Sequence, residues 1–116
     1  MKRVLLVDPL NCSLTVPIEN LCNCKAQQVF SLQQAGDQVE EGAYDFMIID
    51  PYRFPPKHLA VWLADLRFNK PALKIIMLSS CERGIVDQSF RLKIGLHYDF
   101  FVHRDPWPVL KQIINN

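Results

Sequence analysis

The 116-residue sequence has few glycines and lacks repeats, low-complexity segments and any obvious linker. It contains only four glycines, and no stretch stands out by its composition as a boundary between domains. About half of the residues (49%) are hydrophobic and 22% are charged, which is typical of a chain with a normal core. This length suffices for one compact domain and not for two, so we expect residues 1–116 to form a single domain.

The sequence also lacks basic blocks and long apolar runs. Its formal net charge is +1, without the clustered Lys and Arg of a nucleic-acid-binding domain. No stretch approaches the roughly 20 apolar residues of a membrane span, and the N-terminus lacks the apolar region of a signal peptide. These absences predict a cytoplasmic protein that binds neither nucleic acid nor membrane.

The four cysteines do not have the spacing of a metal or redox motif. Cys22 and Cys24 are separated by one residue, whereas the usual zinc and redox motifs have a different spacing, and no histidine is close in sequence. Cys12 and Cys81 stand alone. The pattern predicts reduced thiols.

Two short apolar runs end in an aspartate that is followed by a proline. Residues 4–7 lead to Asp8, and residues 46–49 lead to Asp50. Continuous runs of this length are typical of strands that are buried on both faces, as in a parallel sheet. Sites in open α/β sheets lie just beyond the carboxyl ends of such strands. Asp8 and Asp50 are therefore predicted to converge in one acidic pocket.

Strands and helices are predicted to alternate five times along the chain. The strands are expected at residues 2–7, 26–32, 46–49, 74–78 and 100–102, and the helices at 15–21, 36–42, 57–68, 84–96 and from 107 to the C-terminus. This order predicts an α/β fold, a three-layer α/β/α sandwich in which a (βα)5 chain forms a doubly wound, parallel, five-stranded sheet. The polar residues Asp8, Asp50, Ser79 and His103 or Arg104 then fall at the carboxyl ends of four strands.

Residues 2–8, 44–50, 66–67, 74–80 and 99–102, with Pro71 and Gly95, make the chain resemble a known family. Over essentially its whole length it resembles the CheY-like receiver domain of two-component response regulators, which has a flavodoxin-like fold. The resemblance implies that Asp50 accepts the phosphate, that Ser79 is the switch hydroxyl and that Phe100 is the aromatic that turns inward on activation. It also implies a Mg²⁺ site formed by Asp8, Asp50 and the backbone carbonyl of Tyr52.

Two departures from the receiver pattern predict a degenerate site. Receivers carry a pair of acids after the first strand, and here Pro9 takes the second place. The lysine expected after the fifth strand is missing, and His103 or Arg104 would pair with the phosphate instead. Mg²⁺ requires near-octahedral oxygen ligands, so a weak Mg²⁺ site without any other cofactor is expected.

The resulting hypothesis is an atypical receiver, or pseudo-receiver, that is not an enzyme and acts mainly by binding a histidine kinase or another signalling protein. Phosphorylation of Asp50 is expected to be weak or absent. Two alternatives stay open: a phosphorylation-competent single-domain receiver that relays phosphate from a histidine kinase, and the N-terminal receiver of a longer transcription factor. A flavodoxin-like cofactor carrier is disfavoured, because residues 8–13 do not form a phosphate-binding loop rich in Gly, Ser or Thr.

Aromatic residues near the C-terminus predict an interaction surface. Phe100, Phe101 and Trp107 lie on the final strand and at the start of the final helix. In receivers this region is where partners and sister subunits dock. A homodimer through this aromatic face is therefore a further prediction.

Overall fold

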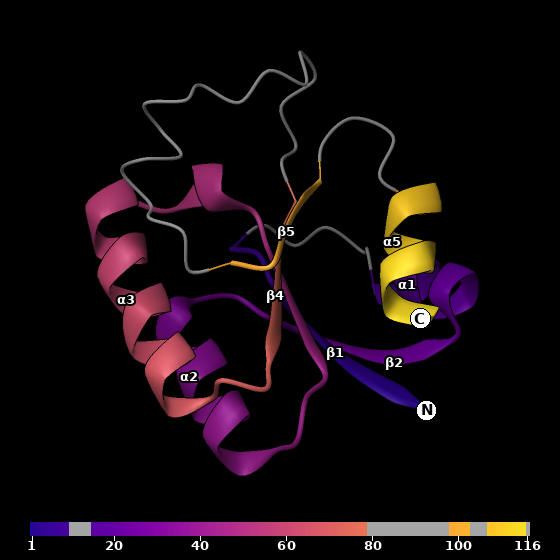
Figure 1. The fold of residues 1–116 in the computed structure, drawn as a ribbon, viewed down its shortest axis with the longest axis horizontal. Coiled ribbons are helices and arrows are strands. Elements are labelled where there is room, and N and C mark those ends of the chain that lie inside the picture. Colours follow the sequence, from indigo (N-terminus) through magenta and orange to yellow (C-terminus); the bar gives the residue numbers. More distant parts are fainter. Residues whose placement is uncertain (10–14, 79–97, 103–106, 116) are drawn as a thin grey trace.

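A five-stranded parallel sheet forms the centre of the molecule. The computed structural model describes residues 1–9, 15–78, 98–102 and 107–115 (Figure 1). The strands follow the order β2-β1-β3-β4-β5, and every neighbouring pair is parallel. Their bounds are Lys2–Val7 for β1, Cys24–Val29 for β2, Phe46–Ile49 for β3, Lys74–Leu78 for β4 and Phe100–Val102 for β5. This is the doubly wound, flavodoxin-like order, in which the direction of winding reverses between β1 and β3.

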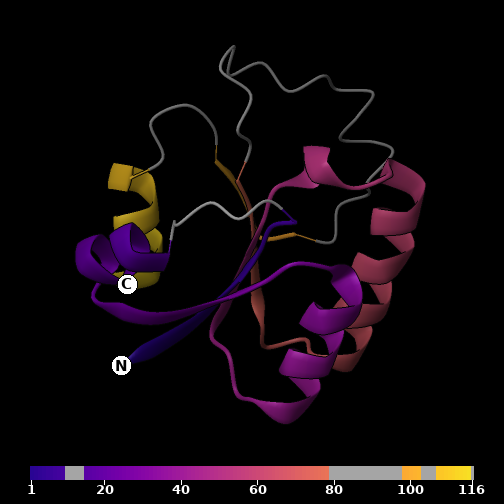
Figure 2. The ribbon, with the colours of Figure 1, turned by 180° about the vertical axis from the view of Figure 1, so that it is seen from behind.

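Helices cover both faces of the sheet. They are α1 (Thr15–Cys22), α2 (Leu32–Glu41), the short 3-10 helix η1 (Pro51–Arg53), α3 (Pro56–Asn69) and α5 (Trp107–Asn115). Figures 1 and 2 show α2 and α3 on one face of the sheet and α1 and α5 on the other. The predicted three-layer sandwich is thereby confirmed, while the helix expected at residues 84–96 lies outside the described residues.

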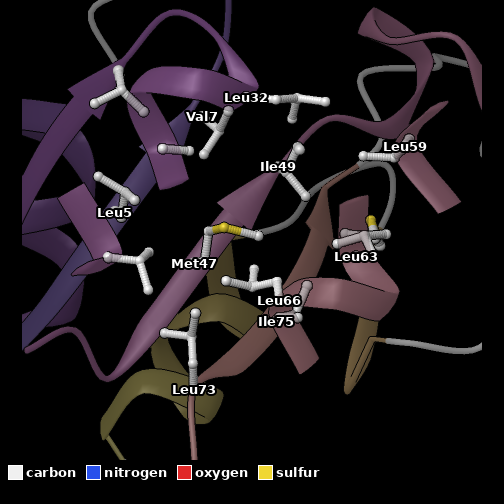
Figure 3. Packing of buried hydrophobic residues seen from close by; sticks show 14 residues of the cluster. Leu5, Val7, Leu32, Met47, Ile49, Leu59, Leu63, Leu66, Leu73 and Ile75 are labelled. Atoms are coloured by element: carbon white, nitrogen blue, oxygen red, sulfur yellow. The ribbon is translucent and has the colours of Figure 1, made fainter. Parts of the chain in front are cut away.

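The central strands are buried on both faces, which explains their uninterrupted apolar sequences. Successive side chains of a strand point to opposite faces of the sheet. In β1, Leu5 and Val7 join the cluster beneath α2 and α3, whereas Val4 and Leu6 join the cluster beneath α1 and α5. Figure 3 shows the first cluster, in which residues of β1, β3 and β4 meet side chains of α2 and α3; the labelled members are Leu5, Val7, Leu32, Met47, Ile49, Leu59, Leu63, Leu66, Leu73 and Ile75.

The longest described helix, α3, agrees with the sequence prediction to within one residue at each end. Leu59, Leu63 and Leu66 are buried against the sheet, and Trp62 is half-buried at the margin of the same cluster. Their i, i+4, i+7 spacing places them on one helical face. Within the described ranges, no helix is long and apolar enough to cross a membrane.

The prediction for the second strand and second helix was wrong in its boundaries. The strand ends at Val29, and the helix begins at Leu32 instead of residue 36. The cause is a pair of capping hydrogen bonds that resembles a capping box: the Ser31 hydroxyl accepts a hydrogen bond from the Gln34 amide (3.1 Å), and the Gln34 side chain accepts one from the amide of Phe30, the residue before the N-cap (2.7 Å). The reciprocal pair ends the strand and starts the helix earlier than the glycine at position 36 suggested. Gly42 closes the helix, as predicted.

Candidate functional site

Asp8 and Asp50 lie together at the carboxyl end of the sheet. Val7 of β1 is paired with Ile49 of β3, so each aspartate is the first residue after its strand at the same end. Neighbouring strands are spaced about 4.8 Å apart. Both residues are almost fully buried, with 6% and 7% of their surfaces exposed, and in the described part of the chain they are the buried charged residues. We call Asp8 and Asp50 the acidic pair.

The acidic pair stands at the point where the winding of the sheet reverses. In doubly wound sheets the helices that follow the strands on either side of this point lie on opposite faces, which leaves a crevice for ligands. Here β1 precedes α1 on one face, and β3 precedes α3 on the other. Asp8 and Asp50 thus lie at the ends of neighbouring strands, whereas their convergence in one acidic pocket and their chemical roles stay predictions.

Asp50 caps the short helix η1. Its Oδ1 accepts a hydrogen bond from the Tyr52 amide at 3.0 Å, and its carbonyl oxygen accepts one from the Arg53 amide at 3.2 Å. Its Oδ2 lies 3.5 Å from Arg53 Nε, close enough for an ion pair. Residues i and i+3 are superimposed along a 3-10 helix, so the turn itself brings Arg53 over Asp50. Pro51 suits the first helical position because it has no amide hydrogen to satisfy.

Asp8 is fixed through its backbone. Its amide donates to the Val29 carbonyl oxygen at 3.0 Å, and its carbonyl oxygen accepts a hydrogen bond from Gln28 Nε2 at 3.3 Å. Both partners belong to the end of β2. The first contact continues the β1–β2 ladder by one residue, so the position of Asp8 is set by the sheet.

The remaining predicted site residues are spread more widely. Tyr52 is in η1 and is 39% exposed, and Phe100 on β5 is 38% exposed. Ser79, His103 and Arg104 lie outside the described residues. Their predicted roles, and those of Tyr52 and Phe100, stay predictions.

The sheet divides the aromatic residues that were predicted to form a dimer face. Phe101 packs on the α2–α3 side, where its ring meets that of Tyr98 edge-on at 5.6 Å. Phe100 has the opposite orientation by the two-residue period of a strand, and Trp107 packs with the α1–α5 cluster. A surface on one side of the sheet could thus include Phe100 and Trp107, with Phe101 behind them. The homodimer stays a prediction.

The donor set around the acidic pair fits Mg²⁺ poorly. Asp8, Asp50 and the Tyr52 carbonyl are the groups that could hold the ion, which requires six oxygens in near-octahedral geometry. Mg²⁺ usually keeps several waters and is held by one or two carboxylates, and Pro9, next to Asp8, adds no side-chain oxygen to the set. Asp50 Oδ1 already accepts a hydrogen bond, and Oδ2 faces a guanidinium. Over residues 1–9, 15–78, 98–102 and 107–115, no group of three or more His, Cys, Asp or Glu side chains could hold a metal.

Arg53 is the residue of this site that the sequence analysis missed. It lies three residues after Asp50, at the end of η1. The available signal was local: an aspartate, a proline and an arginine at the third position after the aspartate are compatible with a capped 3-10 turn. Such a turn places the basic side chain beside the carboxylate.

The cysteine pair has a structural role. Cys22 and Cys24 are free thiols that lie buried at the α1–β2 junction, and Cys24 Sγ lies 3.7 Å from the Ile18 carbonyl oxygen. Burial raises the pKa of Cys24 to about 11, with added contributions from the neighbouring Cys22 and Glu19. Burial also raises the pKa of Cys22, against a smaller opposing effect of Lys111. Thiols of this kind are protonated and unreactive at neutral pH.

Comparison with known proteins identifies the fold. No protein-family model matches the sequence, and no curated protein matches it either. Among solved structures, the response regulator TrrA of Thermotoga maritima, in complex with Mg²⁺-BeF, is 22% identical with a TM-score of 0.73, covering 98% of this chain and 96% of that one. A CheY-like receiver domain protein of Methanospirillum hungatei is 17% identical with a TM-score of 0.70, covering 97% and 90% of the two chains.

An orphan response regulator of H. pylori gives a similar result. It is 15% identical with a TM-score of 0.69, and the match covers 97% of this chain and 90% of that one. The class defined by these likenesses is the CheY-like receiver fold. At such low identity the likeness concerns the fold alone.

Proposed function

We propose that the chain is an atypical receiver domain of two-component signal transduction. Residues 1–116 form one non-enzymatic, cytoplasmic domain that acts mainly by binding other proteins, and Asp50 is phosphorylated weakly or not at all. The observation that carries this proposal is the acidic pair, buried at the switch point of a receiver-type sheet, with Pro9 in the place of a further acid. The receiver fold supports the first part of the proposal, and the poor donor set supports the second.

The chemistry of phosphoryl transfer explains why the donor set matters. Transfer to a carboxylate depends on positive charge that neutralises the phosphoryl oxygens and holds them in line. At most two carboxylates of the described residues meet here, and Asp50 already has partners for both of its oxygens. The geometry therefore favours a resting state with little tendency to accept a phosphoryl group.

A histidine kinase or another signalling protein is the proposed partner. TrrA, 22% identical to this chain, has been solved in complex with the histidine kinase ThkA. The shared fold makes a protein of that class the first candidate. In this proposal the contact, rather than the phosphoryl group, transmits the signal.

Incubation with acetyl phosphate and Mg²⁺ tests the proposal directly. We expect intact-protein mass spectrometry to show little phosphorylation of the wild-type chain, and the same trace amount or less in Asp50→Ala. Rapid, stoichiometric phosphorylation that disappears in Asp50→Ala would overturn the atypical part and leave the receiver assignment in place.

A phosphorylation-competent receiver is the second candidate. The observation in its favour is that Asp8 and Asp50 are both buried at the same end of neighbouring strands, as a working acidic pocket requires. In this case Ser79 would be the switch hydroxyl, and His103 or Arg104 would pair with the phosphate. Beryllofluoride with Mg²⁺ mimics the phosphoryl group, and NMR shifts of the Asp8, Asp50 and Tyr52 amides would reveal binding. The absence of any response would leave protein interaction as the role.

A further inference from the structure

The ion pair between Arg53 and Asp50 has one buried end. Arg53 Nε lies 3.5 Å from Asp50 Oδ2, and the two side chains are 36% and 8% exposed. An ion pair that is exposed at both ends contributes little to stability. Here the carboxylate is shielded from water and stands next to a second buried carboxylate, so a nearby positive charge has a larger effect than it would on the surface.

The local backbone favours this contact. Asp50 Oδ1 binds the Tyr52 amide, which orients the carboxylate so that Oδ2 faces the guanidinium. Arg53 is at the end of a single 3-10 turn, whose geometry places residues i and i+3 on the same side. A guanidinium is always charged and weakly hydrated, so it can stay beside a buried acid at low cost.

From these contacts, and on the basis of the proposed function, we propose that Arg53 is the resident cation of the acidic pair. It occupies the place beside Asp50 Oδ2 that a divalent cation would need, and it excludes that ion. The site is thereby neutralised by the protein's own side chain. Its resting conformation does not depend on Mg²⁺.

The test compares Mg²⁺ affinities of charge variants. In Arg53→Gln, Asp50 Oδ2 loses its cationic neighbour, and we expect Mg²⁺ to bind at least about tenfold more tightly than in the wild type, because a unit charge roughly 5 Å from a divalent ion is strongly repulsive even when partly exposed. Titrations followed by NMR shifts of the Asp8, Asp50 and Tyr52 amides give the affinities. Arg53→Lys retains the positive charge and should bind as weakly as the wild type.

Two controls separate competition at Oδ2 from a general charge effect. Lys57→Gln removes one positive charge from an exposed side chain in the first turn of α3, and it should leave the affinity unchanged. Adding Asp50→Asn to Arg53→Gln should abolish the gain, because the carboxylate that binds the ion is gone. Equal affinity of Arg53→Gln and wild type, or an equal gain in Lys57→Gln, would overturn the inference.

Thermal unfolding provides a readout that does not depend on NMR. A ligand that binds only the folded state raises the Tm, so at a Mg²⁺ concentration about tenfold above the Kd of Arg53→Gln we expect the Tm of this variant to rise by about 4 °C and that of the wild type by about 1 °C or less. If Arg53→Gln does not fold fully, Arg53→Met retains the aliphatic stem and allows the same comparison. The outcome is independent of the phosphorylation test, because efficient labelling of the wild type would refute the atypical function, whereas an unchanged affinity in the variants would refute the role of Arg53.

Discussion

At the amino end of the sheet Asp45 and Asp99 each stand just before a strand, whereas at the carboxyl end Asp8 and Asp50 each follow one. Asp45 makes two contacts with the same residue of β1: its amide donates to the Arg3 carbonyl oxygen, and its Oδ2 accepts from the Arg3 amide, both at 2.9 Å. Asp99 repeats this arrangement with Ile75 of β4, at 2.8 and 2.7 Å. Each carboxylate thus accepts the hydrogen bond of a strand amide at the point where the pairing of two parallel strands begins.

The comparison shows that the same residue type has different tasks at the two ends. At the amino end the carboxylates accept hydrogen bonds from strand amides, and Asp99 also pairs with Arg67 at 2.7 Å. At the carboxyl end the acidic pair is more deeply buried, and Asp50 binds its own turn instead of a neighbouring strand. The amino-end aspartates should therefore stabilise the fold, whereas burial of the acidic pair should weaken it.

The largest expected effect is that of Asp99→Ala. The substitution removes the ion pair with Arg67 and leaves the partly buried Ile75 amide without its acceptor. We expect the free energy of unfolding to fall by about 2–3 kcal/mol, as is usual for hydrogen bonds to charged groups. Urea unfolding of the variant and the wild type measures this difference in the free energy of unfolding.

Two variants sharpen this result. Asp99→Asn keeps an oxygen for the Ile75 amide, so its free energy of unfolding should fall by about half as much as that of Asp99→Ala. Asp45 is more exposed, and Asp45→Ala should lower the free energy of unfolding by about 1 kcal/mol. If all three variants unfold like the wild type, the ladder contacts at the amino end do not contribute to stability.

The next effect concerns Cys24, the first residue of β2 at the same amino end. Its pKa of about 11 is above the ordinary value of 9.0, so the thiol is harder to ionise in the folded state. Its contribution to stability is complete below about pH 9 and is lost as the pH rises toward 11. Between about pH 8 and about pH 11, we expect the free energy of unfolding of the wild type to fall by about 1–2 kcal/mol more than that of Cys24→Ala, as measured by urea unfolding. Parallel losses in the two proteins would contradict this prediction.

The smallest effect, and one of opposite sign, is expected at the acidic pair. Asp8 and Asp50 follow neighbouring strands, which are spaced about 4.8 Å apart. At such a spacing two like charges repel by roughly 3 kcal/mol at an effective dielectric near 20, and Arg53 offsets part of this repulsion. Asp8→Asn should therefore raise the free energy of unfolding by about 1 kcal/mol. Asp37→Asn, at an exposed position of α2, is the matched control and should have no effect. A clear loss of stability in Asp8→Asn would show that both ends of the sheet depend on their aspartates.

The strands whose bounds were predicted best are those marked in the sequence by a short apolar run. The bounds of β1, β3, β4 and β5 agree with the sequence prediction, because a short apolar run has little freedom in where it starts and ends. The outer strand β2 alternates between buried and exposed residues, so its limits depend on the capping hydrogen bonds of Ser31 and Gln34, which the apolar pattern does not reveal. Local hydrogen bonding, rather than hydrophobicity, decides this boundary.

The acidic pair could be predicted because the carboxyl ends of neighbouring parallel strands lie at the same end of the sheet. The contacts around it could not, for two different reasons. Arg53 reaches Asp50 through a turn type that the residues permit without requiring it. The contacts of Asp45 and Asp99 join residues 42 and 24 positions apart, and no periodicity reports on such pairs.

The interior position of β1 has a consequence for synthesis on the ribosome. The strand is made before both of its neighbours, which are β2 on one side and β3 on the other, and β3 ends at Ile49. A nascent chain that stops short of this point leaves one edge of β1 with unpaired backbone N–H and C=O groups, which are prone to intermolecular strand addition. Chaperones that hold emerging polypeptides should therefore engage this protein before β3 has left the exit tunnel, and release it afterwards.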